Sequence, residues 1–297
     1  MSRPVPRLAL TALLALASAA AAACPGREIT HAAGVTCVPG TPKRVVVLDI
    51  GPLDTALALG VKPVGAVSKF ADSDDFVSYL NGRTGGIQNV GVITQPSLER
   101  ILALKPDLIL SSKVRHGEIY AQLSRIAPTV LSESVGATWR ENLLLWGDAL
   151  GKKAQAQTLL NRFRVRARTV GQKFPRASIS VVRFLPGQTR IMHRASFIGT
   201  VLDEAGLSRP ASQRVNDFAA MVSQEAIPQM DASHLFYTTW GDPKATTQSE
   251  MMGSPLWKNL AAVKAGRAFA VDDDFWMTGT GILAANRVLD DLEKYLK

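Results

Sequence analysis

Motifs that mark common enzyme and metal-binding classes are scarce in this chain of 297 residues. Its two cysteines form no C-x-x-C pair, which argues against a zinc ribbon or a dithiol redox centre. Its four histidines lack the H-E-x-x-H spacing of a zinc protease. No G-x-S-x-G nucleophile elbow is present either. These absences weigh against an enzyme, and an exported α/β hydrolase or oxidoreductase is the less favoured alternative.

Two other patterns resemble functional motifs only weakly. GTGILA (279–284) imitates the dinucleotide-binding G-x-G-x-x-A, but it follows DDDFWMT instead of a strand. Three adjacent acids, Asp272, Asp273 and Asp274, could attract a cation, yet neighbouring side chains on a strand cannot all point at one ion. We expect a solvated rim here, no cofactor, and no direct metal ligand from the protein.

Long hydrophobic runs are also missing, and the apolar segment near the N-terminus points to export instead. Arg3 and Arg7 precede the ten-residue run LALTALLALA, and small residues follow it as far as Ala23. This order is typical of a secretory signal peptide. The run is too short to span a bilayer, which takes about 20 residues. We predict a signal peptide over 1–23 and a mature protein in the periplasm or associated with the cell envelope.

Positive charge exceeds negative charge, with 34 Lys and Arg against 25 Asp and Glu. Removing 1–23 takes away two arginines and no acids, so the net charge falls from +9 to +7. A basic exported protein attracts nucleic acid, anionic lipid or a small anionic ligand. Because the basic residues are scattered and form no single run, we expect no nucleic-acid partner.

The two cysteines, Cys24 and Cys37, have two interpretations. In an exported protein they can form a disulfide that clips the segment between them to the following lobe. Cys24 is also the first residue after the expected cleavage, which is the place of a lipid-acceptor cysteine. The preceding alanines lack the large aliphatic residue usual three places before such a cysteine. The disulfide is favoured, and a lipid anchor at Cys24 remains the alternative.

Strand and helix patterns alternate at short spacing through most of the chain. Continuous apolar runs over 43–49, 61–67, 107–112 and 233–240 are typical of strands buried on both faces, and amphipathic helical patterns separate several of them. ISVVRF and TRIMHR, after Pro175, are two further strand patterns. This order predicts α/β lobes with parallel, doubly wound sheets. ITHAAGVTCV predicts a small hairpin near the start of the mature chain.

The middle of the chain contains no strand pattern. Apolar residues keep a helical phase from 139 to 174, weakly interrupted at Gly151, so this segment is one long helix or two. A helix of about 30 residues reaches about 45 Å, which suits a strut between two lobes. We predict an N-terminal α/β lobe over 24–138, a bridging helix over 139–174 and a C-terminal α/β lobe over 175–297.

In open α/β sheets, ligands bind beyond the carboxyl ends of the strands. Arginine forks bind carboxylates bidentately, and tryptophan supplies a flat apolar wall. We therefore predict a cleft between the lobes for a carboxylate-rich anion, although each residue is also explained by a solvated loop, a surface ion pair or the core. The predicted ligand-binding residues are Arg115, His116, Arg183, Arg194, Trp240 and Trp276, and Asp49, Lys69 and Lys113 also follow strands.

A short repeat links the two halves. Ser-x-Glu-x-Ile starts at Ser97 and again at Ser223, each time before an apolar strand. It places Glu99 and Glu225 at equivalent points of the two lobes. Glu99 lies about 100° from Leu98 around its helix, toward solvent. Such acids are ordinarily explained by the helix dipole, but an equivalent pair could also dock a partner with two basic pockets.

Five segments, in this order, carry a family resemblance: THAAGVTCVPGTPKRVVVLD, VGVITQPSLERILALKPDLILSS, RHGEIYAQLSRIAPTVL, SPLWKNLAAVKAGRAFAVD and GILAANRVLDDL. Residues 28–297 resemble the periplasmic binding proteins of iron–siderophore and cobalamin ABC importers. The ferric dicitrate-binding branch is most similar, because QPSLERILALKPDLIL is followed by Arg115 and His116. The resemblance implies a class III solute-binding protein, with two Rossmann-like lobes bridged by a long helix and no enzymatic activity.

The resemblance also implies a role for particular residues. The protein would capture a ferric siderophore, anionic and citrate-type, and deliver it as a monomer to an ABC permease, with ferric iron present only within the chelate. Glu99 and Glu225 match glutamates that bind arginines of the two permease subunits. Arg115 and His116 fit a citrate cleft lined by arginine and histidine. Haem, cobalamin and catecholate or hydroxamate chelates are the alternative ligands within the same transporter class.

Overall fold

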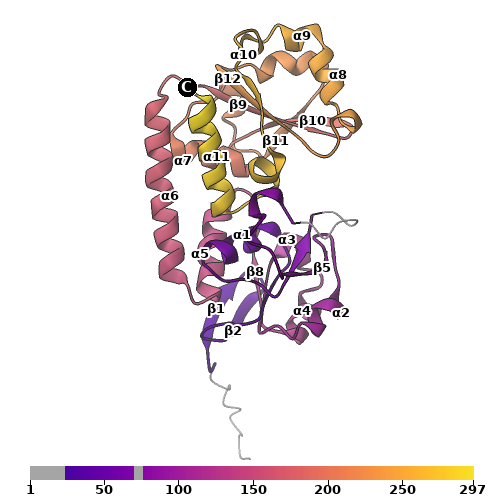
Figure 1. Ribbon diagram of the computed structural model, residues 1–297, viewed down its shortest axis with the longest axis vertical. Helices are drawn as coiled ribbons and strands as arrows, with labels where there is room; N and C mark the ends of the chain where they lie inside the picture. The colour runs from indigo at the N-terminus through magenta and orange to yellow at the C-terminus, as the bar shows by residue number, and fades with distance from the viewer. Residues whose placement is uncertain (1–23, 70–75) are drawn as a thin grey trace, which may run out of the picture.

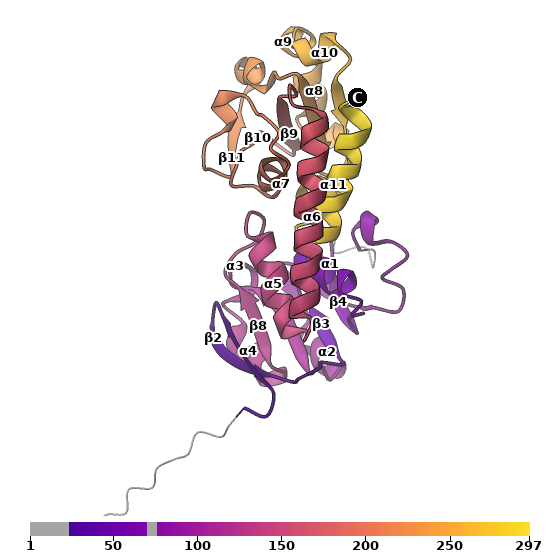
Figure 2. The same cartoon turned by 90° about the vertical axis from the view of Figure 1, so that its left-hand side faces the viewer.

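The computed structural model describes residues 24–69 and 76–297, so the predicted signal peptide over 1–23 lies outside the described residues. Two α/β lobes lie end to end, and helix α6 runs beside both, with α11 packed against it (Figure 1, Figure 2). This is the predicted fold class, two Rossmann-like lobes bridged by a long helix. Helix α6 spans Lys153–Lys173 and α11 spans Ile282–Tyr295.

Lobe one is built on a six-stranded sheet in the order β6-β5-β4-β3-β7-β8. Its strands pair in parallel except for β6, which pairs antiparallel with β5. The inner strands β3 and β7 are buried at every position, as their continuous apolar sequences predict. The elements are β3 Val45–Val47, α1 Ile50–Ala58, β4 Gly65–Ser68, β5 Gln88–Val92, β6 Gln95–Pro96, α2 Leu98–Ala103, β7 Leu108–Ser112, α3 Lys113–His116, α4 Tyr120–Ile126 and β8 Thr129–Ser132.

The predicted hairpin precedes lobe one and consists of β1 (Arg27–His31) and β2 (Gly34–Val38). A disulfide joins Cys24 to Cys37. The hairpin turn contacts the sheet, because the Ala32 N–H donates to the Leu131 carbonyl at 3.0 Å. A cysteine held in a disulfide has no thiol left for a lipid, so the disulfide and the lipid anchor exclude each other at Cys24.

The bridging segment forms two helices, α5 (Trp139–Ala149) and α6, which answers the question left open by the sequence. The break falls at Gly151, whose φ of 72° is the left-handed conformation that favours glycine. Helix α5 packs on α1 of lobe one, and α6 packs on α5 and on α7 and α11 of lobe two. Helix α6 therefore links α5, on the lobe-one side, to lobe two, and α11, which also packs on α1, makes a further link.

Lobe two has a five-stranded sheet in the order β11-β10-β9-β12-β13. Strands β9, β12 and β13 pair in parallel, but β10 pairs antiparallel with β9 and with β11, so the sheet of lobe two is mixed and departs from the predicted parallel pattern at β10. Only Pro186 and Gly187 separate β9 from β10, and a parallel crossover takes a dozen residues or more. The elements are β9 Ile179–Leu185, β10 Gln188–Met192, α7 Phe197–Ala205, β11 Ala219–Val222, β12 His234–Thr239, α8 Gln248–Gly253, α9 Pro255–Lys258, α10 Ala261–Lys264 and β13 Ala268–Ala270.

One hydrophobic core runs through the helices and joins the lobes. Trp139, Trp146 and Phe163 are fully buried in it, and the rings of Trp139 and Phe163 meet edge to face at 5.1 Å. The Trp139 indole N–H donates to Thr200 of lobe two at 2.9 Å. Burying each such side chain contributes about 2–3 kcal/mol, so separating α5 and α6 from lobe two is costly.

A buried carboxylate makes a second connection between the lobes. Asp54 in α1 accepts hydrogen bonds from the backbone N–H groups of Leu283 (2.9 Å) and Ala284 (3.0 Å), in the first turn of α11. The Tyr79 hydroxyl also donates to it, at 3.0 Å. Asp54 therefore satisfies N–H groups that a helix cannot pair internally, and it ties α11 to lobe one.

Candidate ligand-binding site

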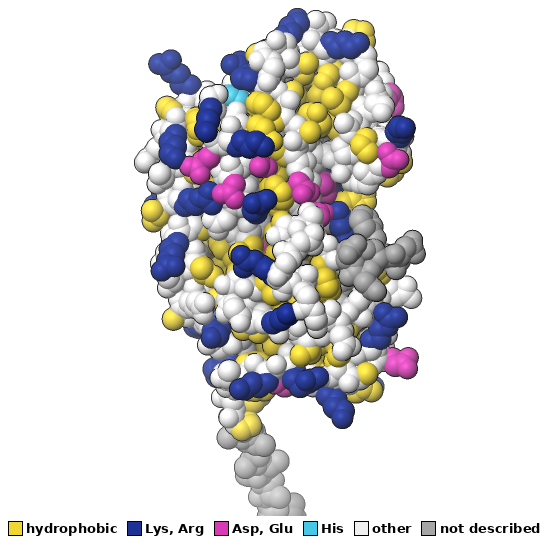
Figure 3. All heavy atoms as spheres, in the orientation of Figure 1, with side chains coloured by type: hydrophobic (Ala, Val, Ile, Leu, Met, Phe, Trp, Pro, Cys, Tyr) yellow, Lys and Arg dark blue, Asp and Glu magenta, His cyan; other side chains and the backbone are white. Residues whose placement is uncertain are grey.

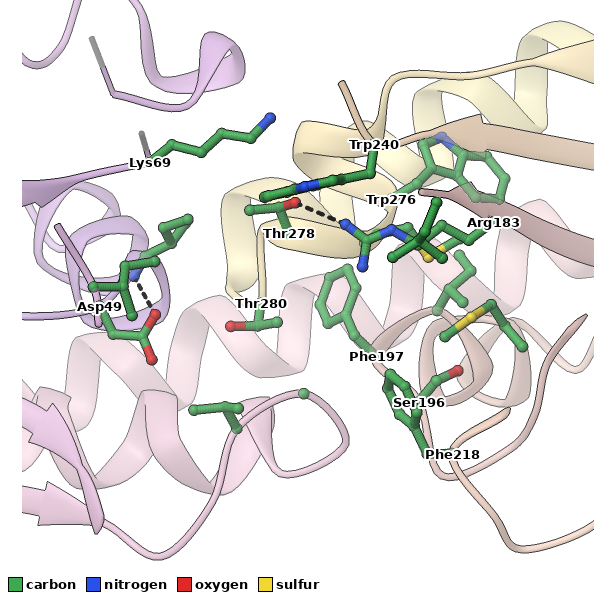
Figure 4. A pocket seen from close by; sticks show the side chains of 18 of the residues that line it. Asp49, Lys69, Arg183, Ser196, Phe197, Phe218, Trp240, Trp276, Thr278 and Thr280 are labelled. Atoms are coloured by element: carbon green, nitrogen blue, oxygen red, sulfur yellow. Dashed lines mark hydrogen bonds between the residues drawn. The ribbon is translucent and has the colours of Figure 1, made fainter. Parts of the chain in front are cut away.

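A cavity of about 480 Å³ lies between the two lobes and is lined by both. Lobe one contributes Arg115 of α3 and residues at or after the ends of β3, β4, β5 and β8. Lobe two contributes the β9–β10 hairpin, the start of α7 and the segment from Trp276 to Thr280. Figure 4 shows Asp49 and Lys69 facing Arg183, Phe197 and Trp240 across the cavity. The cavity therefore lies where the strand-end argument placed a ligand.

The lobe-two side carries a pair of arginines set by the β9–β10 hairpin. Arg183 in β9 and Arg190 in β10 are direct register partners, and both line the cavity. Asp273 accepts two hydrogen bonds from Arg183, at 2.8 Å to Nε and 2.6 Å to Nη2. Arg190 donates from Nε to Gln188 at 3.1 Å and lies over the Phe218 ring. The hairpin thus presents two guanidinium groups, one neutralised by Asp273.

Trp240 forms part of the cavity wall between two cations. The Lys69 ammonium lies 4.7 Å from the centre of its ring and the Arg183 guanidinium carbon 5.0 Å. Figure 4 shows the ring edge-on, with Lys69 on one side and Arg183 on the other. Cation–π contacts of this kind hold the indole in place. Because Lys69 belongs to lobe one and Trp240 to lobe two, the contact also crosses the cleft.

Lys69 is anchored by an acid from the opposite lobe. It forms an ion pair with Asp274, which also accepts a hydrogen bond from the Ser78 backbone N–H at 2.7 Å. Burial alone raises the pKa of Asp274, but the hydrogen bonds from Lys69 and Ser78 outweigh it and lower that pKa below its usual value. Asp274 is therefore ionised and paired with Lys69 of lobe one, and the prediction of a solvated rim was wrong at this position.

The lobe-one wall contains Asp49 and Arg115. Asp49 is the N-cap residue of α1, and its Oδ1 accepts from the Ile50 backbone N–H at 2.7 Å. Its Oδ2 lies 3.4 Å from Arg115 Nε. Burial raises the pKa of Asp49, and the charge of Arg115 opposes that rise. The Arg115 side chain is 43% exposed at the cavity, so it can reach a ligand while Asp49 orients it.

His116 does not line the cavity, which differs from the prediction. Its Nδ1 lies 2.6 Å from the Ser111 hydroxyl and its Nε2 lies 2.8 Å from the Ile93 carbonyl. Burial lowers its pKa. The segment after β7 is a short helix and no loop, so consecutive side chains diverge by about 100°. Arg115 therefore faces the cleft and His116 packs beneath it.

Of the two remaining predicted residues, Trp276 lines the cavity and Arg194 lies outside it. Trp276 lines the cavity, but it is fully buried, stacks on Phe236 at 4.8 Å and donates to Asp291 at 2.8 Å, so it supports the wall. Arg194 does not line this cavity. Its Nε donates to Asp203 at 2.9 Å beside α7.

Among the residues of the lobe-two wall that sequence reasoning missed are Arg190, Phe197 and Phe218. A signal for Arg190 was available, because a two-residue turn between two predicted strands places 190 opposite 183. Phe197 begins α7 and Phe218 precedes the edge strand β11, and neither lies at the end of a predicted strand. Within the described residues, no group of three or more His, Cys, Asp and Glu side chains is placed to hold a metal ion.

Glu99 and Glu225 are exposed and lie in equivalent positions. Each occupies the first turn of a short helical segment, α2 in lobe one and Gln224–Met230 in lobe two. Each follows a serine by two residues, and Ser223 donates its hydroxyl to Glu225. That hydrogen bond lowers the pKa of Glu225. Neither residue lines the cleft.

Comparison with known proteins identifies the family. A family model described as periplasmic binding protein matches residues 45–275. The probable siderophore-binding lipoprotein YfiY of Bacillus subtilis is 42% identical over 284 residues, covering 91% of this chain and 87% of that protein. The Fe(3+) dicitrate-binding periplasmic protein FecB of Escherichia coli is 29% identical, covering 86% and 85%.

Solved structures show the same fold. SirA of Staphylococcus aureus, solved in complex with staphyloferrin B, superposes with a TM-score of 0.81 at 35% identity, covering 91% of this chain and 98% of that one. Along the described chain, every helix is too short or too polar to cross a bilayer. These relatives are solute-binding proteins and not enzymes, and those named with a location are periplasmic proteins or lipoproteins. The chain is therefore an extracytoplasmic member of the periplasmic binding protein family.

Proposed function

We propose that this protein captures an anionic, carboxylate-rich ferric siderophore of the citrate type and delivers it to an ABC permease. The charge of the cleft carries the proposal. Among the described lining residues, four are cationic, Lys69, Arg115, Arg183 and Arg190, and one is acidic, Asp49. Asp273 and Asp274 pair with Arg183 and Lys69, so the group as a whole has one positive charge in excess. Arginine binds carboxylates bidentately, and such contacts discriminate against neutral or cationic chelates.

The aromatic side chains suit a ligand with an organic body around the charged groups. Phe197, Phe218 and Trp240 line the lobe-two side of the cavity. Figure 4 shows Phe197 and Phe218 near each other on that wall, next to Arg183. Flat apolar surface beside guanidinium groups binds a chelate whose carboxylates are held by carbon chains. In this proposal iron enters only inside its chelate, and no protein side chain binds it directly.

The names of relatives support a siderophore and leave its type open. YfiY is named as a siderophore-binding protein, FecB as a ferric dicitrate-binding protein, and SirA was solved with staphyloferrin B. The 42% identity to YfiY exceeds the 29% identity to FecB, so sequence similarity does not single out dicitrate. The proposal of a citrate-type ligand therefore rests on the cationic side chains that line the cleft.

Glu99 and Glu225 are the proposed contacts to the permease. They are exposed, equivalent in the two lobes and outside the cavity, so a partner can bind them while the cleft is filled. On the face shown in Figure 3, Lys and Arg side chains are scattered and not gathered in one stripe. This distribution gives no support for a nucleic-acid partner. We propose that the protein acts as a monomer.

Titration of the purified mature protein with a panel of ferric chelates tests this function. The chelates are ferric dicitrate, ferrioxamine and a catecholate complex, with iron-free citrate as the control, and tryptophan fluorescence reports binding. Trp240 in the cleft wall makes the signal sensitive to occupancy. We expect saturable binding of ferric dicitrate and none of ferrioxamine. Binding of only the neutral or cationic chelate contradicts the proposal, and a Soret band after purification from rich medium points to haem.

A further inference from the structure

A second cavity, of about 310 Å³, lies in lobe two and has no described lining residue in common with the cleft. It is formed by the end of α7 and the loop that follows. Its only apolar side chain among the described residues is Leu207, so its chemistry is polar. The lining residues are Arg194, Asp203, Gly206, Leu207, Ser208, Arg209 and Arg214.

Arg209 is unusual because it is buried without an acidic hydrogen-bond partner. The residue is 2% exposed, and its Nη2 donates to the Met192 carbonyl. Within the described chain, its Nε and Nη1 have no hydrogen-bond acceptor. Burial lowers its pKa to about 10, and the nearby positive charge of Arg194 contributes, while Asp203 acts in the opposite direction. Buried guanidinium groups ordinarily have acceptors for their N–H groups.

Arg194 and Arg214 add two more guanidinium groups to the same cavity. Arg194 is 51% exposed and is held by Asp203. Arg214 donates from Nε to the Arg209 carbonyl at 2.7 Å and from Nη2 to the Ser208 hydroxyl at 3.2 Å. Three arginines against one aspartate leave the lining with an excess of two positive charges. The buried His193 next to Arg194 also has an Nδ1 without a hydrogen-bond partner among the described residues.

We propose that this cavity is an anion site, separate from the siderophore cleft, that binds a phosphate-type dianion. Guanidinium forks bind tetrahedral oxoanions through paired charge-assisted hydrogen bonds. A dianion balances the two excess positive charges of the lining. It also supplies the acidic hydrogen-bond partner that Arg209 does not have among the described residues. The volume exceeds that of free phosphate, so a phosphate monoester on a small organic body also fits. Free phosphate and a phosphate-bearing lipid headgroup share this chemistry, and the test separates them.

Isothermal titration calorimetry of the full mature protein with inorganic phosphate, slightly above neutral pH in a phosphate-free buffer, is the first measurement. Glycerol 3-phosphate and vesicles containing phosphatidic acid form the other two arms. The key variant is Arg194→Gln/Arg214→Gln, since both side chains are at the surface. Arg176→Gln, an exposed arginine elsewhere in lobe two, is the matched control. We expect saturable phosphate binding that the double variant weakens about 10- to 100-fold and the control leaves unchanged.

A further variant shows whether the two cavities are separate. Arg115→Gln/Arg190→Gln removes charge from the cleft, and we expect phosphate binding to be unaffected. If phosphate fails to bind the wild type, or if the cleft variant abolishes binding and Arg194→Gln/Arg214→Gln does not, the second site is refuted. If the protein binds the vesicles but neither inorganic phosphate nor glycerol 3-phosphate, the proposal of a small-anion site is also overturned. These outcomes are independent of whether ferric dicitrate binds in the cleft.

Discussion

Replacing Asp54 with asparagine should change how the free energy of unfolding depends on pH. Asp54 is fully buried between α1 and α11, where Leu283, Ala284 and Tyr79 donate hydrogen bonds to it. Burial raises its pKa from 3.8 to about 6, even though these hydrogen bonds act in the opposite direction. The unfolded chain therefore releases this proton at a lower pH than the folded protein does.

The direction of the effect follows from the two pKa values. At a pH well below 3.8, Asp54 is protonated in both states, and its contribution to stability is fully present. As the pH rises through about 6, the unfolded chain has already ionised and the folded protein must bury a charge, so that contribution is lost. A shift of about two units at 1.36 kcal/mol each corresponds to about 3 kcal/mol.

Urea unfolding of the wild type and Asp54→Asn across this pH range measures the effect. We expect the stability of the wild type, relative to the variant, to fall by about 3 kcal/mol between pH values of about 3 and 7. The exposed carboxylate of Glu118 provides the control, and Glu118→Gln should follow the wild type. Parallel curves for the wild type and Asp54→Asn, separated by a constant offset, would refute the reasoning.

Three further changes test the fold and the docking proposal. A Cβ at Gly171 would overlap the Ala205 carbonyl where α6 meets α7. In thermal unfolding, Gly171→Ala should therefore lower the stability by about 1–3 kcal/mol. Gly253→Ala is the control, because a Cβ at Gly253 would point into open space. Cys37→Ser opens a loop of sequence separation 13 and should cost about 3 kcal/mol in urea unfolding; an unchanged midpoint would show that the disulfide does not form. Glu99→Ala/Glu225→Ala should keep ligand affinity and abolish cellular iron uptake; continued uptake would disprove the docking role.

Sequence reasoning located the cleft because chain direction fixes which end of a parallel strand meets the ligand. Arg115, Arg183 and Trp240 follow or end strands whose apolar runs are unambiguous, and all three line the cavity. The alternation of strand and helix patterns was sufficient to predict two α/β lobes, each built on its own sheet. The reversed strand β10 of lobe two was missed, although the turn at Pro186 and Gly187 is too short for a parallel crossover.

The direction of individual side chains could not be predicted where local geometry changes after a strand. His116 turns away from the cleft because Lys113–His116 is helical, and four residues give too little periodicity to show it. Arg194 lies outside the cleft, where its backbone N–H donates to the Val215 carbonyl at 3.3 Å and its Nε donates to Asp203 of α7. That contact joins residues far apart in sequence and leaves no local pattern.

Calorimetric titration of ferric dicitrate into the wild type and into Arg115→Gln/Arg190→Gln tests the central claim most directly. Arg115 and Arg190 line opposite walls of the cleft, and neither forms the bidentate pair that Arg183 makes with Asp273. We predict that the double variant weakens binding by about 2–5 kcal/mol, while Arg176→Gln leaves it unchanged. Equal affinity of the double variant and the wild type would contradict an arginine cleft that recognises an anionic ferric chelate.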